Sequence, residues 1–425
     1  MPQKPLHVLI IGAGLGGACL AHGLKSAGVG VTVYERVAAR HEGAFGCRVT
    51  IDPDGDRALR NALPPDLYNT FTATCAEPPR HLTVYSEVLE ELFTTAPPVV
   101  GRRGAALRYT SHMTLRQLLL TGIEDVVRFG KEFVRYERRP DGRIAAFFSD
   151  GTTAVGDVLV GADGADSRVR RQLLPQAGLQ DCGFTTAYGK VDLLEAARLL
   201  PWEMLRGISV VRGASGPVLV TQPMDFLWDS SGELKGHVHG LDAALLSTWA
   251  GRRHDDTRDH LTWWLFGPSG LFPAAPERLR GADLVEAVGG MTRHWDPALH
   301  TLLGLSEPDA AAATRAVVSR PAEPREATGV TLLGDAGHVR LPDPGEGANA
   351  ALAAAWSLSG LLAEAAAGRP VAAAIRDHET RLPASGFDFS AYWKRLYRQA
   401  RADTPVIGPV PAAGPGLRAV RGDSG

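Results

Sequence analysis

The apolar pattern at the start of the chain predicts a strand, a helix and a second strand. Residues 6–11 form a short, β-branched apolar run, which is typical of a strand buried on both faces of a parallel sheet. A helical pattern follows, with Leu20 and Leu24 on one side. Residues 30–34 predict the second strand, which ends at Glu35. We therefore expect a βαβ unit at the N-terminus.

Two later segments carry similar strand and turn signals. Short alternating runs between 131 and 155 are separated by Pro-Asp-Gly and Ser-Asp-Gly turns, which indicate hairpins. An apolar strand at 157–161 then leads into a helix. Another strand at 330–333 precedes a turn, a loop and an Ala/Leu-rich helix from about 350 to 367. A meander followed by a return strand and a helix fits a crossover within a dinucleotide-binding domain.

The stretch between these segments predicts a sheet with many aromatic side chains. Residues 207–220 alternate between apolar and polar positions. This stretch contains a dense set of aromatic residues, namely Phe226, Trp228, Trp249, Trp263, Trp264, Phe266 and Phe272. They predict an apolar pocket for a small molecule. The alternative is ordinary packing in the core, and it is the stronger explanation for any one of them.

Two histidines of this stretch are candidate substrate contacts. His237 and His239 alternate on an expected strand, so they would share one face. There they would bind the substrate or take up a phenolic proton, and Trp228 is a further candidate contact. The alternative is an ordinary hydrogen-bonded or solvated face.

Composition and charge exclude several classes of protein. The chain has 425 residues, a formal net charge of −2 and 44% hydrophobic residues, as in a globular protein of two or three domains. The balanced charge argues against a nucleic-acid-binding protein. The four cysteines form no Cys-x-x-Cys pair, which argues against a metal site or disulfide framework. We see no signal peptide or membrane span and expect a cytoplasmic protein.

The turn after the first strand carries a dinucleotide-binding motif. Gly12, Gly14 and Gly17 fit G-x-G-x-x-G, in which the glycines allow a tight turn, close approach of a pyrophosphate and close helix packing. The free N–H groups of the helix, which begins near Leu15, attract the phosphates. Glu35 follows at about the 20-residue spacing expected of a ribose-binding acid, and it disfavours a 2′-phosphate. The motif alone leaves NAD and FAD open.

Three ordered fingerprints give the chain a family resemblance. The second is G-A-D-G-x-x-S-x-V-R at 161–170, and the third is the Gly-Asp-Ala-Gly-His turn at 334–338 followed by Pro342, Gly345, Gly347 and Asn349. From Val8 to about Leu382, the chain resembles the class A flavoprotein aromatic monooxygenases. These include para-hydroxybenzoate hydroxylase, salicylate hydroxylase, the tetracycline-inactivating monooxygenases and zeaxanthin epoxidase.

The resemblance implies an α/β fold with two interleaved domains. The first is a Rossmann-like FAD-binding domain of the glutathione-reductase type, with a βαβ unit and a β-meander, from residues 1–74, 106–182 and 276–384. The second is an inserted, mostly β substrate domain from 75–105 and 183–275. Residues 385–425 would form a C-terminal helix with aromatic residues at helical spacing and a flexible tail.

The resemblance also assigns cofactor contacts. The pyrophosphate would lie against the turn of Gly12, Gly14, Leu15 and Gly17, with Glu35 and Arg36 along the ribose and adenine. Asp163 would support the cofactor and NAD(P)H, and Asp335 the ribityl chain and pyrophosphate. The N–H groups of Gly347 and Ala348 would face the flavin pyrimidine, and Arg48 the flavin or nicotinamide.

Two positions depart from the family pattern. His112 stands where relatives commonly place an arginine that touches the flavin, and Arg116, one turn later, is a possible replacement. Ala354 stands where they often have an aspartate, so the helix lacks that charge. Neither departure removes the prediction of FAD binding.

The resemblance implies a monooxygenase. NAD(P)H would bind transiently and reduce FAD, and a flavin C4a-hydroperoxide would then transfer one oxygen atom from O₂ to an aromatic or polycyclic substrate, such as a secondary metabolite. The expected partners are therefore the substrate, O₂ and NAD(P)H, without nucleic acid or membrane, in a monomer or homodimer. The absence of a Trp-x-Trp-x-Ile-Pro motif argues against a halogenase. The alternatives are a flavoprotein of this fold that does not oxygenate, such as a redox sensor or scaffold, another FAD-dependent oxidoreductase, and an NAD-dependent dehydrogenase.

Overall fold

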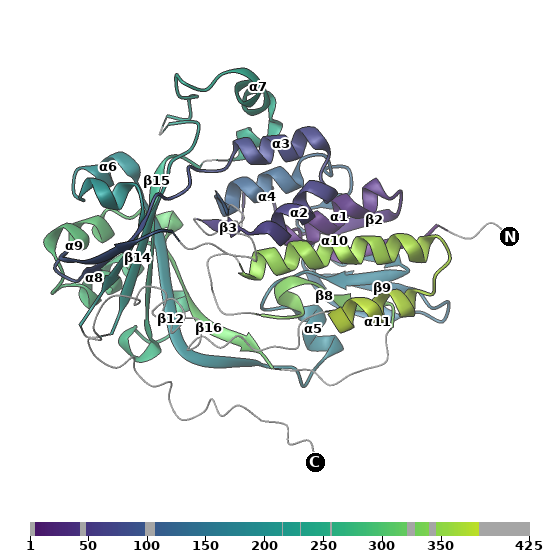
Figure 1. The fold of residues 1–425 in the computed structure, drawn as a ribbon. Helices are drawn as coiled ribbons and strands as arrows, with labels where there is room; N and C mark the ends of the chain where they lie inside the picture. Colours follow the sequence, from purple (N-terminus) through teal and green to yellow (C-terminus); the bar gives the residue numbers. More distant parts are fainter. Residues whose placement is uncertain are drawn as a thin grey trace, which may run out of the picture.

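Four sheets organise the part of the chain that the structure describes. The structure is a computed structural model, and it describes residues 5–42, 48–97, 107–214, 216–229, 231–255, 257–320, 328–339 and 346–381. Within these residues lie a five-stranded parallel sheet, a three-stranded meander, a seven-stranded sheet and a two-stranded pair. Figure 1 shows the five-stranded and seven-stranded sheets in separate halves of the molecule.

The five-stranded sheet has the order β17-β11-β1-β2-β7, and every neighbouring pair is parallel. Its strands are β1 (His7–Ile11), β2 (Gly30–Tyr34), β7 (Val127–Arg128), β11 (Val158–Gly161) and β17 (Val330–Leu332). Helices α1 (Leu15–Ser26) and α10 (Glu346–Ala366) pack against each other beside it, and α11 (Val371–Arg381) follows (Figure 1). The predicted βαβ unit is therefore confirmed.

The first strand is buried on both of its faces. Val8 and Ile10 belong to the core that contains α1 and α10, whereas Leu9 and Ile11 pack into a second core with the meander. The meander consists of β8 (Phe133–Arg138), β9 (Ile144–Phe148) and β10 (Thr153–Gly156), and α5 (Arg168–Leu173) packs beside it. Burial on both sides explains why this strand is continuously apolar rather than alternating.

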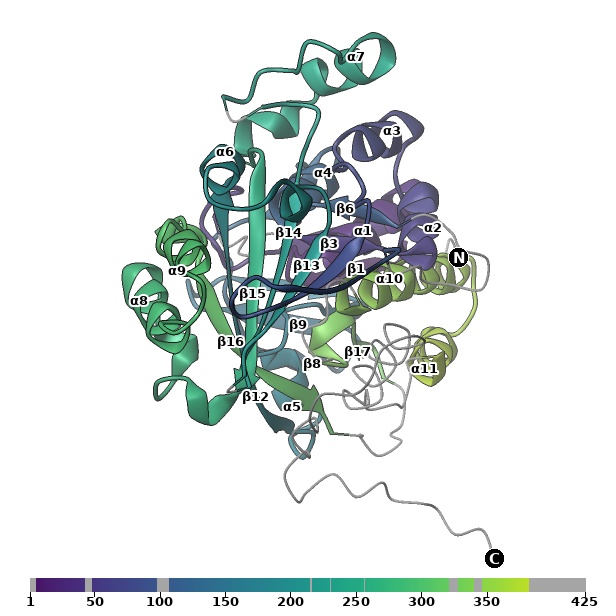
Figure 2. The ribbon, with the colours of Figure 1, turned by 60° about the vertical axis from the view of Figure 1, so that its left-hand side comes forward.

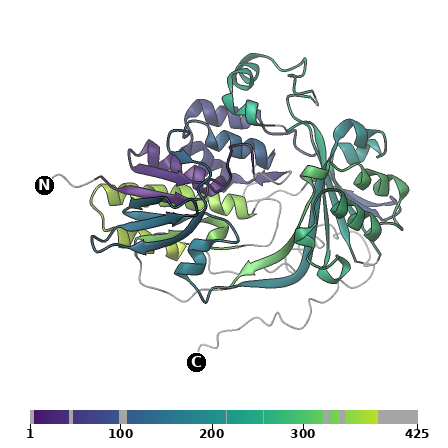
Figure 3. The same ribbon diagram turned by 180° about the vertical axis from the view of Figure 1, so that it is seen from behind.

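The seven-stranded sheet has the order β16-β12-β15-β14-β13-β4-β5. Its strands are β4 (Leu82–Ser86), β5 (Glu91–Thr95), β12 (Leu179–Asp192), β13 (Ile208–Arg212), β14 (Val218–Met224), β15 (His260–Pro268) and β16 (Ala312–Ser319). Helices α6 (Leu193–Ala197), α8 (Gly281–Met291) and α9 (Pro297–Gly304) lie on its outer side (Figure 2). The other side faces the half that contains the five-stranded sheet (Figure 3).

The packing of residues 276–319 differs from the predicted division of the chain. We assigned this segment to the dinucleotide-binding part, but α8 and α9 share a core with β12 and β15, and β16 pairs with β12. The apolar residues Leu284, Val288 and Leu302 are fully buried in that core. Their burial stabilises α8 and α9 on the seven-stranded sheet, so the predicted boundary at 276 does not match the packing.

The remaining elements pack mostly with the core that contains α1 and α10. They include α2 (Pro53–Ala62), α3 (Pro65–Ala73), α4 (His112–Leu120), α7 (Gly240–Thr248) and the strand pair β3 (Val49–Ile51) with β6 (Arg108–Thr110). Short 3-10 turns are η1 (Trp202–Leu205), η2 (Ala250–His254), η3 (Ser269–Leu271), η4 (Pro276–Arg278), η5 (Pro308–Ala310) and η6 (Gly334–Ala336).

Two expectations concern membrane segments and the tail. None of the helices in the described ranges is long and apolar enough to cross a membrane. The predicted C-terminal helix and tail at 385–425 lie outside the described residues. Because the strands of the five-stranded sheet are parallel, the carboxyl ends of β1, β2, β11 and β17 lie along one edge of that sheet.

Candidate functional site

The turn after β1 forms a cradle that only glycine can build. Gly12 has a φ of 107°, and a Cβ there would lie 2.3 Å from the carbonyl oxygen of Ala162. A Cβ on Gly17 would lie 2.1 Å from the carbonyl oxygen of Gly12. A Cβ on Gly14 would instead meet no atom within 4 Å. Two glycines are thus required by close packing, while the third borders open space.

The N-terminus of α1 opens onto this space without a cap. Gly14 is its N-cap residue, makes no side-chain cap, and no acidic residue lies in the first turn. The first N–H groups of the helix, starting at Leu15, therefore point towards the cradle with the positive end of the helix dipole. A phosphate group satisfies such groups. The residues present fit the pyrophosphate of a dinucleotide, and the contact itself stays a prediction.

Glu35, at the end of β2, fastens this turn. Its carboxylate accepts hydrogen bonds from the main-chain N–H of Ala13 at 2.8 Å and of Val37 at 3.2 Å. Glu35 is only 9% exposed, whereas the next residue, Arg36, is exposed. Glu35 thus links two strand ends, and its contact with a ribose and that of Arg36 with adenine stay predictions.

The second fingerprint is a cap for α5. The carboxylate of Asp163 accepts from Ser167 Oγ at 2.5 Å and from the N–H of Arg168 at 2.8 Å, and Ser167 Oγ accepts from the N–H of Arg170. This double cap positions the turn after β11 beside the turn after β1. The contact of Asp163 with FAD or NAD(P)H is untested by this geometry.

The third fingerprint is tied to the second through a buried arginine. Arg170 is 5% exposed and donates to the carbonyl oxygens of Asp335 at 3.0 Å and Ala336 at 3.1 Å. Asp335 itself is exposed, and its Oδ1 lies 3.6 Å from the place that a Cβ on Gly347 would take. Sequence reasoning quoted Arg170 within the fingerprint but gave it no role.

The start of α10 is held by a residue whose role was also missed. Gly347 and Ala348 lie in its first turn, because the helix begins at Glu346, a few residues before the start near 350 that the sequence predicts. Asn349, buried beside them, donates to the carbonyl oxygen of Thr50 at 2.8 Å and accepts from the N–H of Asp52 at 3.1 Å. Its position in G-x-G-x-N was the available signal. Asn349 thereby fixes β3 against the helix end that we expect to face the flavin.

His112 and Arg116 lie on α4. The Nδ1 atom of His112 is buried and has no hydrogen-bond partner among the described residues. Burial and the nearby Arg116 lower the pKa of His112 to about 4, so the imidazole is neutral at pH 7. Arg116 is buried and donates to the carbonyl oxygen of Arg40 at 2.6 Å, close to Glu35. The guanidinium of Arg116 is therefore directed to the segment after β2.

Arg48 reaches from β3 to the seven-stranded sheet. Its Nη1 donates to Oε1 of Gln222 on β14, and its guanidinium carbon lies 4.6 Å from the ring centroid of Trp264. The Tyr109 ring lies on the same guanidinium at 5.7 Å. Arg48 thus contacts the sheet on the side that faces the parallel sheet.

The register of the sheet places the aromatic residues predicted to line a pocket on two opposite faces. Trp263 and Phe272 are buried in the core with α8 and α9, whereas Trp264 and Phe266 are half-buried on the opposite face. The half-buried Tyr188, which pairs with Trp264, shares that inner face. Sequence reasoning did not single out Tyr188. Only part of the predicted aromatic set is therefore available to a ligand between the two halves.

The strand predicted for His237 and His239 does not form. Both side chains are exposed, His237 in a turn and His239 as the N-cap residue of α7. Two nearby glycines break the run, and Gly240 has a φ of 66°, which a strand does not allow. The two histidines therefore share no sheet face. A role in substrate binding is untested, but the argument that placed them together was wrong.

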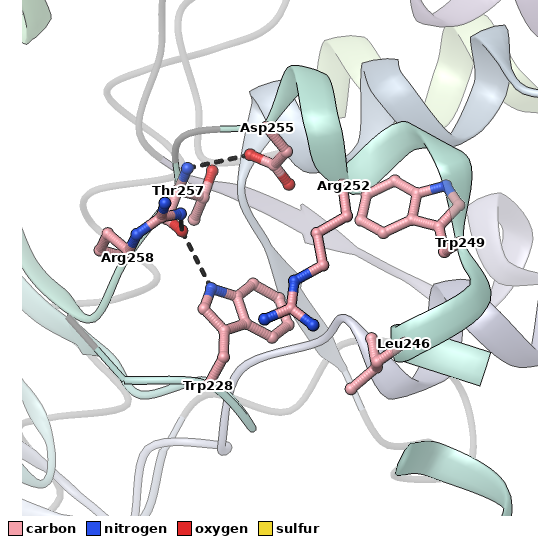
Figure 4. A pocket seen from close by; sticks show the side chains of 7 residues that line it. All are labelled: Trp228, Leu246, Trp249, Arg252, Asp255, Thr257 and Arg258. Atoms are coloured by element: carbon pink, nitrogen blue, oxygen red, sulfur yellow. Dashed lines mark hydrogen bonds between the residues drawn. The ribbon is translucent and has the colours of Figure 1, made fainter. Parts of the chain in front are cut away.

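Trp228 lines a small cavity beside α7 (Figure 4). The cavity is too small for a cofactor or an aromatic substrate, and its lining residues are Trp228, Leu246, Trp249, Arg252, Asp255, Thr257 and Arg258. The indole N–H of Trp228 donates to the carbonyl oxygen of Thr257 at 2.9 Å, and its ring stacks on Phe226. These contacts anchor the segment around α7, so substrate contact by Trp228 stays a prediction.

The described ranges contain no cluster of side chains that could bind a metal ion. No three His, Cys, Asp or Glu side chains among these residues are grouped as a metal ion would require. Cys19, Cys75 and Cys182 are free thiols, and burial raises the pKa of Cys19 and Cys75 to about 12. These two thiols are inert at neutral pH.

Comparison with known proteins gives relatives along most of the chain. No family model matches it. A dual O-methyltransferase/FAD-dependent monooxygenase of Phaeosphaeria nodorum is 31% identical over 399 residues, 85% of this chain and 41% of that protein. This chain thus spans well under half of that fungal relative. The FAD-dependent urate hydroxylase of Klebsiella oxytoca is 28% identical over 384 residues, 88% of this chain and 85% of that protein.

A solved structure agrees over nearly its full length. It is a protein of Photorhabdus luminescens subsp. laumondii TTO1, assigned as an FAD-containing monooxygenase. The two structures match with a TM-score of 0.72 and 28% identity, covering 93% of this chain and 96% of the other. The common fold includes both halves of the molecule. By sequence and by fold, the chain is similar to FAD-dependent monooxygenases over most of its length.

Proposed function

We propose that the protein binds FAD and uses NAD(P)H and O₂ to insert one oxygen atom into an aromatic or polycyclic small molecule. The observation that carries the proposal is the convergence of four turns at one edge of the parallel sheet. The turns follow β1, β2, β11 and β17, with the uncapped end of α1 among them. Ligands of open α/β sheets bind outside the carboxyl ends of the strands.

The cradle of Gly12, Gly14 and Gly17 would hold the pyrophosphate, because Gly14 leaves room where a side chain would stand. Asp335 would accept hydrogen bonds from the ribityl hydroxyls, and the N–H groups of Gly347 and Ala348 would face the flavin pyrimidine. When bound, FAD supplies hydride acceptance from NAD(P)H and the activation of O₂. The protein's residues hold the cofactor, orient the substrate and exclude water.

The aromatic side chains on the inner face of the seven-stranded sheet support our proposal that the substrate is aromatic. Tyr188, Trp264 and Phe266 are half-buried there, opposite the half that carries the cradle. Half-buried aromatic rings offer flat apolar area to a planar molecule. The relatives are a urate hydroxylase and an enzyme that combines methylation with oxygenation, which fits aromatic substrates, including secondary metabolites. We infer a substrate of that class.

The proposal also covers the cellular compartment, the oligomeric state and the division of the chain into two parts. Free thiols at Cys19, Cys75 and Cys182 fit the reducing cytoplasm. We propose a monomer or homodimer that needs no nucleic acid. We also propose that residues up to 74, 106–182 and the segment from about 328 bind FAD, and that 75–105 and 183 to about 319 form the substrate part.

Two measurements on the purified protein test the proposal. We expect flavin absorbance after FAD is added, and NADPH oxidation that depends on O₂ and rises with an aromatic substrate. The product should gain one oxygen atom by mass. Flavin binding without any substrate-stimulated oxidation, across a broad aromatic panel, would favour a flavoprotein of this fold that does not oxygenate. A colourless protein that binds NAD would favour a dehydrogenase.

A further inference from the structure

A buried threonine in the long connection between β14 and β15 bonds to the first turn of α4. Thr257 is 3% exposed, and its Oγ1 lies 2.8 Å from the hydroxyl oxygen of Ser111, the N-cap residue of α4. Thr114, in the first turn of that helix, donates its hydroxyl to the same Oγ1 at 3.1 Å. Three buried hydroxyl groups from two distant segments of the chain are thus joined at one point.

The other polar atoms of Thr257 fix the position of its hydroxyl. Its main-chain N–H donates to the carboxylate of Asp255 at 3.0 Å, and its carbonyl oxygen accepts from the indole N–H of Trp228 at 2.9 Å (Figure 4). The guanidinium of Arg258 donates to the same carbonyl oxygen at 2.7 Å. Every polar atom of Thr257 therefore has a partner, and the hydroxyl is held in place against α4.

The turn that Thr257 holds contains His112. This histidine lies between Ser111 and Thr114 in the sequence, and its buried Nδ1 has no hydrogen-bond partner in the described ranges. A buried polar atom of this kind costs free energy unless a ligand supplies the missing partner. The neutral imidazole carries one donor and one acceptor, and FAD has groups that match either of them.

Two sets of contacts connect this turn to the candidate FAD site. Arg116 lies one helical turn after His112 on the same side of α4, close enough to Glu35 for their charges to interact. Glu35 in turn accepts from the N–H of Ala13 in the cradle. On the other side, β6 leads directly into α4 and pairs with β3, which Asn349 holds against the first turn of α10. The start of α4 is thereby linked to the cradle and to the start of α10.

We propose that Thr257 is a positioning residue of the FAD site, whose hydroxyl sets the first turn of α4 so that His112 bonds to the cofactor. Without that hydroxyl, Ser111 and Thr114 lose their shared partner, and the turn that carries His112 is no longer fixed. Thr257 belongs to a connection that leaves the seven-stranded sheet, so it acts on the cofactor from the other half of the molecule. The inference rests on the proposed function, because it concerns the FAD site.

A double-mutant cycle on FAD affinity tests the inference. The flavin-free, full-length protein is titrated with FAD, and flavin fluorescence gives the dissociation constant for the parent, Thr257→Val, His112→Ala and the double variant. Valine keeps the shape of threonine without its hydroxyl, so we expect Thr257→Val to bind FAD about three to ten times more weakly. In the His112→Ala background the same change should alter affinity by no more than about 1.5-fold, because its effect passes through His112.

Two further variants separate positioning from a general loss of stability. Thr257→Ser keeps the hydroxyl and should bind FAD within about twofold of the parent. The matched control is Thr292→Val, because Thr292 is also fully buried and donates its hydroxyl to the carbonyl oxygen of Val288 at 3.0 Å. Thr292 lies at the end of α8, on the outer side of the seven-stranded sheet. The control should unfold at a lower urea concentration and leave FAD affinity unchanged.

Each other outcome counts against the inference. It is overturned by a Thr257→Val protein that binds FAD as tightly as the parent, or that loses the same affinity with and without His112. An equal loss in Thr292→Val would also overturn it, because reduced stability would then be the cause. Should Thr257→Val fail to fold, Thr114→Val removes one bond of the same cluster and takes its place in the cycle. A parent protein that binds no FAD would overturn the proposed function as well, so the two failures are distinguishable.

Discussion

The guanidinium of Arg170 donates to the main-chain carbonyl oxygen of Asp335 at 3.0 Å, across 165 residues of sequence. The same guanidinium reaches Ala336 at 3.1 Å and also donates to the carbonyl of Ala165. One buried side chain thus joins the turn after β11 to the turn after β17. The spacing between the two turns at the candidate FAD site therefore depends on Arg170 as much as on the strands.

Replacing Arg170 should weaken both the fold and the proposed FAD site. Arg170→Met leaves the carbonyl oxygens of Ala165, Asp335 and Ala336 without this donor, so we expect the free energy of unfolding to fall by about 2 to 4 kcal/mol. Urea unfolding measures that loss, and flavin fluorescence measures FAD affinity. The neighbouring Arg171→Met, at an exposed position, is the control and should change neither. Unchanged stability in Arg170→Met would contradict the assigned role.

Alanine substitutions of two glycines in the first turn should have separate effects, one on packing and the other on FAD binding. Gly17→Ala places a Cβ 2.1 Å from the carbonyl oxygen of Gly12, so the protein should lose stability or fail to fold. Gly14→Ala meets no atom within 4 Å and its φ of −73° suits alanine, so stability should change by less than about 1 kcal/mol. FAD affinity should nevertheless fall at least tenfold. Thermal unfolding and flavin titration measure the two effects, and tight FAD binding by Gly14→Ala would count against the cradle.

Replacing Asn349 should lower the free energy of unfolding, because this side chain holds β3 against the start of α10. Asn349→Ala leaves the carbonyl of Thr50 and the N–H of Asp52 without their partner, which should cost about 2 kcal/mol in the free energy of unfolding. Because Asn349 holds β3 against the first turn of α10, which we expect to face the flavin, the variant should also lower FAD affinity. Asn61→Ala, at an exposed position of α2, is the control for a lost surface amide. A variant as stable as the parent would show that the contact is dispensable.

Two buried histidines should make the fold sensitive to acid. Burial lowers the pKa of His112 to about 4 and of His260 to about 3, from an ordinary value of about 6.5. Between about pH 6.5 and pH 4 the unfolded chain binds more protons than the folded one. The free energy of unfolding should therefore fall as the pH falls, by up to about 1.4 kcal/mol per pH unit for each histidine.

Urea unfolding at several pH values tests this dependence. His260→Gln should reduce the slope between pH 6 and pH 4, whatever it does to stability at pH 7, because one of the two protons is no longer taken up. His294→Gln, at an exposed position, should leave the slope as it is. A slope that is the same in all three proteins would rule out His260 as a source of acid sensitivity.

Local patterns predicted the parts of the site that lie within one strand–turn–helix unit. The strand, the glycine turn at Gly12 to Gly17 and the helix after it involve neighbours in sequence, so periodicity and turn chemistry were sufficient. The cap by Asp163 was not predicted, although its partners Ser167 and Arg168 are also close in sequence. The contact of Arg48 with Gln222 joins residues 174 positions apart, and it depends on how the two halves meet. No local pattern carries that information.

The errors have physical causes of the same kind. Adjacent tryptophans, Trp263 and Trp264, point to opposite faces of β15, and only the covering helices decide which face is core. Likewise, α8 and α9 follow the predicted boundary at 276 but are held by apolar burial on the seven-stranded sheet. The alternation of His237 and His239 was too short to outweigh the flanking glycines.

We propose that this chain carries FAD in the cradle and delivers oxygen to an aromatic molecule. The most direct measurement is oxygen uptake by the FAD-loaded protein with NADPH, using ¹⁸O₂ and product mass. We predict that a substrate accelerates uptake and that one ¹⁸O atom appears in the product. Oxygen consumption that no aromatic compound accelerates, with no labelled product, would contradict the claim.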